Sequence, residues 1–161
     1  MTDFRRLLCA LAEQQVESIL VGGVAAVAHG ASRLTQDVDL VYRRTPENLR
    51  RIVAALAPLR PYLRGAPPGL PFVFDERTLA HGLNFTFTTE VGDIDLLGEI
   101  AGGGGYDQLI PHTIELDLFG ARHACLDLET LIAVKRAAGR PKDFEAIAEL
   151  EEILDERRRN P

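Results

Sequence analysis

The sequence predicts an α/β fold of the α+β kind, in which helices flank a mixed β-sheet and two further helices end the chain. Helical and strand-like segments alternate in the first third, pairs of strand-like segments separated by glycines follow, and the last segments have helical periodicity. The chain has 161 residues, 46% of them apolar, which is enough to bury one core. We therefore expect residues 1–161 to form a single domain.

The N-terminal part has the pattern helix, strand, helix, strand. Residues 3–15 place apolar side chains at helical spacing, and residues 18–21 form a short apolar run that ends at two glycines. Residues 24–29 are small and apolar, and Gly30 is suited to close a helix there. Residues 37–42 alternate in the manner of a strand.

The middle of the chain predicts a helix, a loop and a hairpin. A proline begins residues 46–59, whose apolar stripe indicates a helix. Residues 61–71 contain four prolines and two glycines without periodicity, which indicates a surface loop. Residues 84–89 and 93–97 alternate on either side of Gly92, so we expect them to pair as a hairpin.

The C-terminal third predicts a second hairpin and then two helices. The four glycines of residues 102–105 are interpreted as a connector, because no Lys-Ser or Lys-Thr pair follows them as in a phosphate-binding loop. Residues 113–119 and 122–126 alternate on either side of a glycine turn. Helical patterns cover residues 128–138 and 142–158, with a glycine ending the first of them.

Charge and hydropathy exclude several classes of protein. The formal charge of -6 argues against non-specific coating of nucleic acid, although it allows a nucleic-acid substrate. The longest apolar run, residues 19–28, is shorter than the roughly 20 residues that a membrane span needs, so we expect no membrane segment. Cys9 and Cys125 lie in apolar runs and no signal-peptide pattern is present, so we expect buried thiols and a cytoplasmic location.

Basic residues are concentrated in two stretches. We interpret the first stretch as a solvated helix face; it contains Arg43, Arg44, Arg50, Arg51, Arg60 and Arg64. The second stretch precedes the last predicted helix and contains Lys135, Arg136, Arg140 and Lys142.

The most informative segment joins two glycines to two aspartates. Gly22 and Gly23 follow the first predicted strand, and thirteen residues separate them from Asp37 and Asp39 on the second. Acids at i and i+2 share one face of a strand with backbones about 6.6 Å apart, so both carboxylates can bind the same hard cations. Uncovered glycine amides at the start of a helix favour phosphate oxygens. Together these residues predict a site for a metal-chelated polyphosphate.

This pattern resembles the signature of the nucleotidyltransferase superfamily that includes DNA polymerase beta. The signature is an apolar residue, Gly, Gly or Ser, about a dozen residues, and then Asp, apolar, Asp or Glu, apolar. The resemblance implies a minimal nucleotidyltransferase fold and a third acid, between apolar residues, on a later strand. Asp95 matches that description, and Asp93 is the alternative on the same face. We favour Asp95 because Asp93 directly follows the turn glycine.

The wider pattern is similar to the AbiEii-like toxin nucleotidyltransferases. The run from the two glycines through Arg33 and Thr35 to the aspartates matches this family, and so does a late lysine followed by an Arg-x-Lys-Asp element. The resemblance spans about residues 20–145. It implies a nucleotide-binding set of Gly22, Gly23, Arg33, Thr35, Lys135, Arg140, Lys142 and Asp143.

Elementary chemistry suits several of these positions. Lys135 can reach a triphosphate or a base, and Arg140 can neutralise a leaving pyrophosphate. Asp143 either caps the last helix or orients Lys135 by pairing with it. Arg33 and Thr35 either line the phosphate pocket or belong to an ordinary loop.

With the resemblance, the expected function is transfer of a nucleoside monophosphate from a nucleoside triphosphate (NTP) such as ATP to a hydroxyl acceptor, with Mg²⁺ or Mn²⁺ as the metal. Asp37 and Asp39 would hold the metal ions, and Asp95 would bind the second ion and help to deprotonate the acceptor. The resemblance implies a tRNA 3' end or a protein as acceptor and an antitoxin protein as partner. Two alternatives stay open: a non-catalytic module that binds a nucleotide or a partner, and an enzyme that modifies a small molecule such as an antibiotic.

Overall fold

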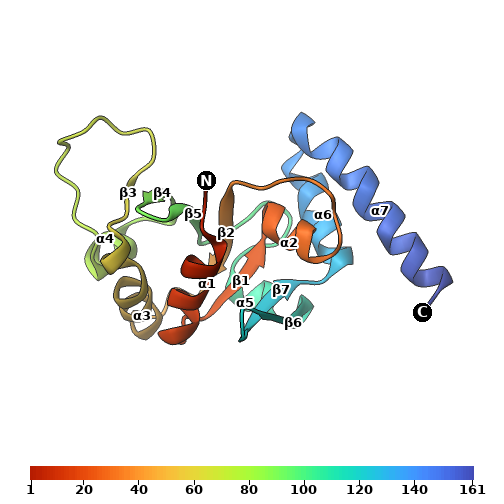
Figure 1. The fold of residues 1–161 in the computed structure, drawn as a ribbon, viewed down its shortest axis with the longest axis horizontal. Helices are drawn as coiled ribbons and strands as arrows, with labels where there is room; N and C mark the ends of the chain where they lie inside the picture. Colours follow the sequence, from red (N-terminus) through yellow and green to blue (C-terminus); the bar gives the residue numbers. More distant parts are fainter.

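The computed structural model describes residues 1–161 as a seven-stranded mixed sheet flanked by helices (Figure 1), which confirms the predicted fold class. The strands are β1 (Ser18–Val21), β2 (Asp37–Tyr42), β3 (Tyr62–Leu63), β4 (Asn84–Thr89), β5 (Gly92–Leu97), β6 (Thr113–Leu118) and β7 (Ala121–Leu126). The α-helices are α1 (Phe4–Glu13), α2 (Gly22–Ala28), α3 (Pro46–Leu56), α4 (Glu76–His81), α5 (Tyr106–Leu109), α6 (Leu128–Ala138) and α7 (Phe144–Arg159). Short 3-10 helices are η1 (Ala57–Leu59), η2 (Ile110–His112) and η3 (Pro141–Asp143).

The strand order is β3-β4-β5-β2-β1-β7-β6. The central strands β1 and β2 are antiparallel, whereas β5 runs parallel to β2 and β7 runs parallel to β1. Both predicted hairpins are present, as β4–β5 and β6–β7. The strand that carries the first two acids therefore lies in the middle of the sheet, with a parallel neighbour on one side.

Local chemistry explains where the helices begin and end. The side chains of four N-cap residues each accept a hydrogen bond from the backbone N–H three residues later: Asp3, Thr45, Asp75 and Asp127. Pro46 is the first residue of α3, as predicted. Gly139 ends α6 in the left-handed conformation, with φ of +65°, where a side chain would be strained.

Helices α3 and α4 lie toward one end of the molecule, α6 and α7 lie toward the other, and α1 and α2 lie between them (Figure 1). Helix α1 packs against α3, and α6 packs against α2 and α7. The alternate residues of the central strands are buried beneath them, including Leu20, Val38, Leu40, Ile94 and Leu96. None of the helices combines the length and the apolar character required to cross a lipid bilayer.

The structure corrects the predictions for residues 46–71. The helix from Pro46 ends at Leu56 and continues to Leu59 only as the 3-10 turn η1. Part of the predicted loop is strand β3, which pairs with β4 at the edge of the sheet. Two residues are too few to show strand periodicity in the sequence. Residues 62–63 form a strand because they pair with β4.

Three further features differ from the sequence predictions. Helix α4 falls in a stretch for which no element was predicted, and six residues are too few for a clear apolar stripe. The last helix begins at Phe144 rather than at Lys142, because η3 precedes it. Cys125 is buried as expected, but Cys9 is only partly buried, since α1 turns it toward the edge of its apolar face.

A buried amide joins the strands that carry the site. Asn48 is fully buried on α3, and its side chain accepts a hydrogen bond from the N–H of Glu17 at 2.7 Å. The same amide donates to the carbonyls of Glu17 at 2.9 Å and Arg43 at 2.7 Å. These carbonyls lie just before β1 and just after β2, so Asn48 holds the two central strands together at one end.

Asn48→Ala should lower the free energy of unfolding by about 2 to 3 kcal/mol, because it leaves backbone groups buried without partners. Urea unfolding of both proteins measures this difference. Glu47→Gln changes the exposed neighbouring residue and should shift stability by less than about 0.5 kcal/mol. Equal unfolding midpoints for Asn48→Ala and the parent would contradict the structural role of the amide.

Candidate active site

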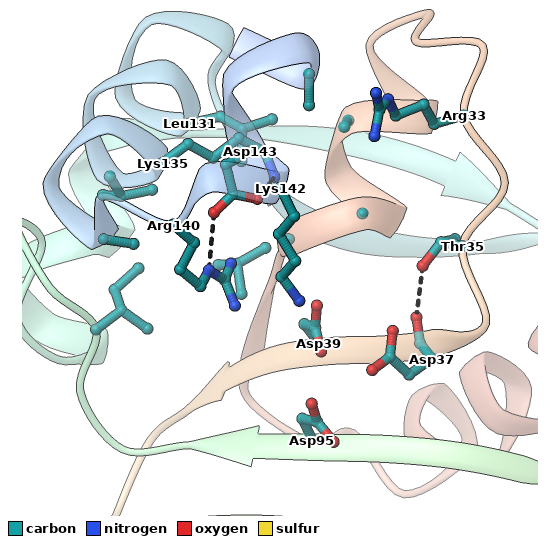
Figure 2. Close-up of a pocket in the computed structure, with 18 of the residues that line it drawn as sticks. Arg33, Thr35, Asp37, Asp39, Asp95, Leu131, Lys135, Arg140, Lys142 and Asp143 are labelled. Carbon is teal, nitrogen blue, oxygen red and sulfur yellow. Dashed lines mark hydrogen bonds and ion pairs between the residues drawn. The ribbon is translucent and has the colours of Figure 1, made fainter.

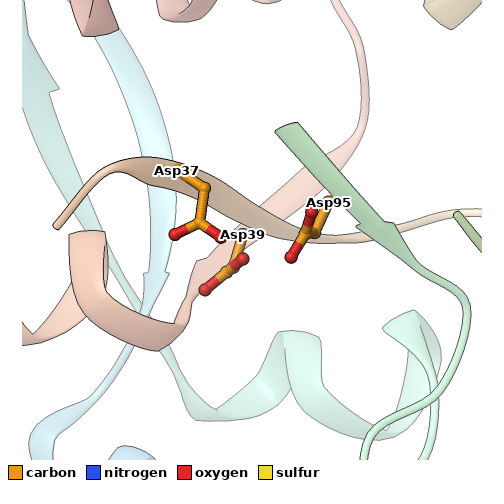
Figure 3. Close-up of side chains that lie close together, drawn as sticks. All are labelled: Asp37, Asp39 and Asp95. Atoms are coloured by element: carbon orange, nitrogen blue, oxygen red, sulfur yellow. The ribbon is translucent and has the colours of Figure 1, made fainter. Parts of the chain in front are cut away.

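Three carboxylates meet at the centre of the sheet, on strands β2 and β5. In the parallel register Asp39 lies beside Asp95, and Asp37 lies two residues before Asp39 on the same face. Neighbouring strands are about 4.8 Å apart, so this register forces the three side chains together. One oxygen from each carboxylate lies within 4.8 Å of the others (Figure 3). The sequence predicted these acids, and the fold brings them into one cluster.

The cluster concentrates negative charge in a half-buried place. Burial and the repulsion from neighbouring carboxylates raise the pKa of Asp39 well above its ordinary value. The pKa of Asp37 is raised by burial first and then by Asp95, although Arg64 opposes the shift. The protein thus holds acids together at a cost in free energy, which a divalent cation between them would reduce.

Asp93, the alternative third acid, lies outside the cluster. It pairs in register with Asp37 rather than with Asp39, and its carboxylate accepts a hydrogen bond from Thr88 on β4. Its other close partner is Arg64, with Nε 3.4 Å from Oδ2. The geometry therefore favours Asp95 as the third acid.

The two glycines lie directly against the acids. Helix α2 begins at Gly22, immediately after β1, and Gly22 has a φ of +64°. A Cβ atom at Gly22 would lie 2.0 Å from Oδ2 of Asp39, and one at Gly23 would lie 2.6 Å from the hydroxyl of Thr35. Only glycine leaves room for both the turn and the acid cluster.

A cavity of about 570 Å³ opens over the acids (Figure 2). This volume is within the range of small-molecule sites. Every residue predicted for the site lines the cavity, whereas Asp93 does not. The acids form its floor, the glycine turn and the segment before β2 form one wall, and α6 with η3 forms the other. Apolar side chains complete the lining, among them Leu97, Ile100, Leu131, Val134 and Ala138.

The basic wall is organised by Asp143. Its carboxylate lies 2.8 Å from Nε of Arg140 and 3.9 Å from Nζ of Lys135. The side chains of Lys135 and Asp143 are each only 8% exposed, and burial lowers the pKa of Lys135 although Asp143 opposes the shift. Asp143 makes no side-chain cap for α7, so the structure supports the pairing interpretation over the capping one.

The remaining predicted residues lie at the mouth of the cavity. Arg33 forms an ion pair with Glu145 at the start of α7. The Thr35 hydroxyl donates to the carbonyl of Asp37 at 3.2 Å. The amine of Lys142 extends toward Asp39 (Figure 2). All three residues line the cavity. For Arg33 and Thr35 this favours the phosphate-pocket interpretation over that of an ordinary loop.

Most of the chain matches the model of one protein family. Residues 6–148 match the model described as "Nucleotidyl transferase AbiEii toxin, Type IV TA system". The chain belongs to this family. It is a nucleotidyltransferase, as the resemblance in its motifs implied.

Two solved structures share the fold of this AbiEii-family chain. A protein from Thermotoga maritima described as a proposed nucleotidyltransferase is 14% identical, with a TM-score of 0.56, and the match covers 97% of this chain and 96% of that one. The antibiotic-resistance factor ANT(2'')-Ia is 16% identical, with a TM-score of 0.52 and coverage of 96% and 88%. The comparison with curated proteins found no match.

Arg64, a charged residue beside the acid cluster, differs from its sequence prediction. The sequence predicts a solvated helix face for it, but its guanidinium contacts the acids, with Nη2 2.7 Å from Oδ1 of Asp95. No local pattern marks it, since the contact depends on β3 pairing with β4 and β4 with β5.

Asp143→Asn should lower the free energy of unfolding by about 3 kcal/mol, because the buried ammonium of Lys135 loses its counter-charge. Urea unfolding at neutral pH measures the loss. The double variant Lys135→Met/Asp143→Asn removes the buried charge as well and should recover part of the stability. If the double variant is no more stable than Asp143→Asn, the pairing does not account for the effect.

Proposed function

We propose that this chain transfers a nucleoside monophosphate from an NTP to a hydroxyl group of a macromolecule, acting as one domain. One observation carries the proposal: Asp37, Asp39 and Asp95 converge at the foot of a nucleotide-sized cavity, directly against a glycine turn. This arrangement has an anionic floor for cations and a basic wall for phosphates. A site with both features suits a metal-chelated triphosphate.

The donor set fits a divalent metal ion. Three carboxylates supply only oxygen ligands, which Mg²⁺ and Mn²⁺ prefer. Burial, and then repulsion from the neighbouring carboxylates, raises the pKa values of Asp37 and Asp39, so a bound cation would relieve an existing repulsion. Bound there, the ion supplies charge neutralisation at the triphosphate and at the acceptor oxygen.

The residues of the chain have separate tasks in this proposal. The uncovered backbone at Gly22 and Gly23 gives phosphate oxygens close access to the floor. Lys142 and Arg140 neutralise the triphosphate and the leaving pyrophosphate, while Asp143 keeps Arg140 and Lys135 in place.

Asp95 receives the proton in this reaction. The acceptor oxygen bonds to the α-phosphorus, the bond from that phosphorus to the pyrophosphate oxygen breaks, and the hydroxyl proton passes to a carboxylate oxygen of Asp95. Asp95 suits this role because it lies on the β4 side of the cluster, away from the glycine turn where the triphosphate would bind.

The acceptor and the biological role rest on the family. Its description names toxins of type IV toxin–antitoxin systems, so we propose a toxin that modifies a tRNA 3' end or a protein and is opposed by an antitoxin. The likeness to ANT(2'')-Ia concerns the fold and does not by itself identify an acceptor. The labelling experiment below therefore includes a small-molecule acceptor among its outcomes.

Gly22→Ala should weaken Mg²⁺-dependent binding of a non-hydrolysable triphosphate by about tenfold or more, because the new methyl group displaces the carboxylate of Asp39. Calorimetry at fixed Mg²⁺ measures the affinity. Gly120→Ala is the matched control: it also has a positive φ, +81°, but no atom within 4 Å of the added carbon. Equal weakening by both substitutions would mean that backbone strain, and not the acid cluster, is responsible.

Asp95→Asn should retain most triphosphate binding but lose transfer by about 10²-fold to 10⁴-fold, the usual contribution of acid–base catalysis. The assay follows label from α-labelled triphosphates into cell extract that is then separated into RNA, protein and small molecules. Asp117→Asn, an exposed acid on β6, should leave transfer unchanged. A parent protein that binds a triphosphate tightly but labels no fraction with Mg²⁺ or Mn²⁺ would be a binding module instead.

A further inference from the structure

Arg64 is fixed at the edge of the acid cluster by the backbone of β4. It follows β3 directly, and its own N–H donates to the carbonyl of Thr86 at 3.0 Å. Its side chain crosses β4, where Nη2 donates to the carbonyl of Phe87 at 2.8 Å. These two bonds hold the guanidinium over the sheet, so its position is part of the fold and not a chance contact of a mobile surface side chain.

The guanidinium reaches three carboxylates on two strands. Its Nη2 lies 2.7 Å from Asp95, its Nε 3.4 Å from Asp93, and its Nη1 3.8 Å from Asp37. The Arg64 side chain is 30% exposed and that of Asp95 is 17% exposed, so solvent screens these contacts only in part. Two of the three partners, Asp37 and Asp95, belong to the candidate metal cluster.

Arg64 lies on one particular side of this cluster. The strand order places β3 and β4 beyond β5, whereas the glycine turn adjoins β1 on the other side of β2. A triphosphate bound at the glycine turn would therefore leave Arg64 on the opposite side, next to Asp95. This is the side from which the acceptor hydroxyl would approach.

We propose that Arg64 is an internal counter-cation that competes with a divalent metal ion for the Asp95 side of the acid cluster. The inference rests on the proposed function of that cluster. The cluster then binds metal weakly by itself, and the negative charge of an incoming triphosphate shifts the balance toward metal. Arg64 would thereby couple metal loading to the arrival of the nucleotide.

Two physical effects lead to this competition. The guanidinium lies against carboxylate oxygens of Asp95 and Asp37, at 2.7 Å and 3.8 Å, which a cation would need as ligands. The fixed positive charge would also repel a divalent cation. As a general scale, a single and a double positive charge about 5 Å apart in water repel by an amount that corresponds to roughly tenfold in affinity. A purely structural Arg64, by contrast, would stabilise β3 without any effect of this sign on metal binding.

Mn²⁺ binding without nucleotide tests the proposal directly. Electron paramagnetic resonance measures free Mn²⁺ during titration of the parent, Arg64→Gln and Arg64→Lys. Arg64→Gln should bind Mn²⁺ on the order of tenfold more tightly than the parent, and Arg64→Lys should lie between them because it keeps the charge but loses the planar contacts. Arg64→Gln that binds Mn²⁺ equally or more weakly overturns the proposal.

Arg60→Gln is the matched control for net charge. It removes the same charge four residues earlier, where the side chain is 82% exposed and pairs with Glu90, and it should leave Mn²⁺ affinity unchanged. A change equal to that of Arg64→Gln would show a general charge effect and overturn the competition.

A second measurement uses only the parent protein and therefore needs no variant. The side-chain Nε resonance of Arg64 in the parent should move when Mg²⁺ and a non-hydrolysable triphosphate are both present, and much less with Mg²⁺ alone. A resonance that stays unmoved at saturation with both overturns the proposal.

The variant Asp39→Asn tests the metal site separately from the role of Arg64. Mn²⁺ binding that survives Asp39→Asn refutes the acid cluster as the metal site. The difference in Mn²⁺ affinity between the parent and Arg64→Gln tests only the counter-cation.

Discussion

The parallel register of β2 against β5 is the constraint on which the site depends. It sets Asp39 beside Asp95 and leaves their carboxylates on one face, where the spacing of strands keeps them close. Such crowding is unfavourable without a counter-charge, and burial together with the neighbouring carboxylates raises the pKa of Asp39. The buried apolar residues on the opposite face of the same strands hold the register, since a slip of one residue would bury the acids and expose the core.

Positively charged side chains lie on two sides of this acid cluster. Asp37 and Asp95 are contacted by Arg64 from the β4 side, while Lys135 and Arg140 form the opposite wall with Asp143 between them. These cations come from widely separated parts of the chain, so their assembly depends on the whole sheet and on α6. An anionic floor between cationic walls is complementary to a ligand that is itself a cation bound to a polyanion.

The glycine turn connects this electrostatic arrangement to the fold. Gly22 takes a left-handed conformation exactly where β1 gives way to α2, and the absent side chain is what allows Asp39 to occupy its place. The cavity above the turn includes an apolar lining from β5 and α6. The sheet thus supplies the acidic floor, α6 and η3 supply the basic wall, and β5 and α6 also supply apolar lining. These elements are far apart in the sequence, in keeping with a family match that extends over residues 6–148.

The sequence by itself determined the elements and motifs whose information is local. Strand alternation, helix caps and turn glycines act within a few residues, so the two hairpins, the paired acids and the late Lys135 element were predictable. The sequence favoured Asp95 over Asp93 because Asp93 directly follows the turn glycine, and the register of β2 against β5 adds an independent reason, since Asp95 lies beside Asp39. Helix α4 is too short to show a clear apolar stripe. Only the tertiary structure revealed the roles of Arg64 and β3, because their partners lie on neighbouring strands and no short-range pattern encodes a contact that long-range pairing creates.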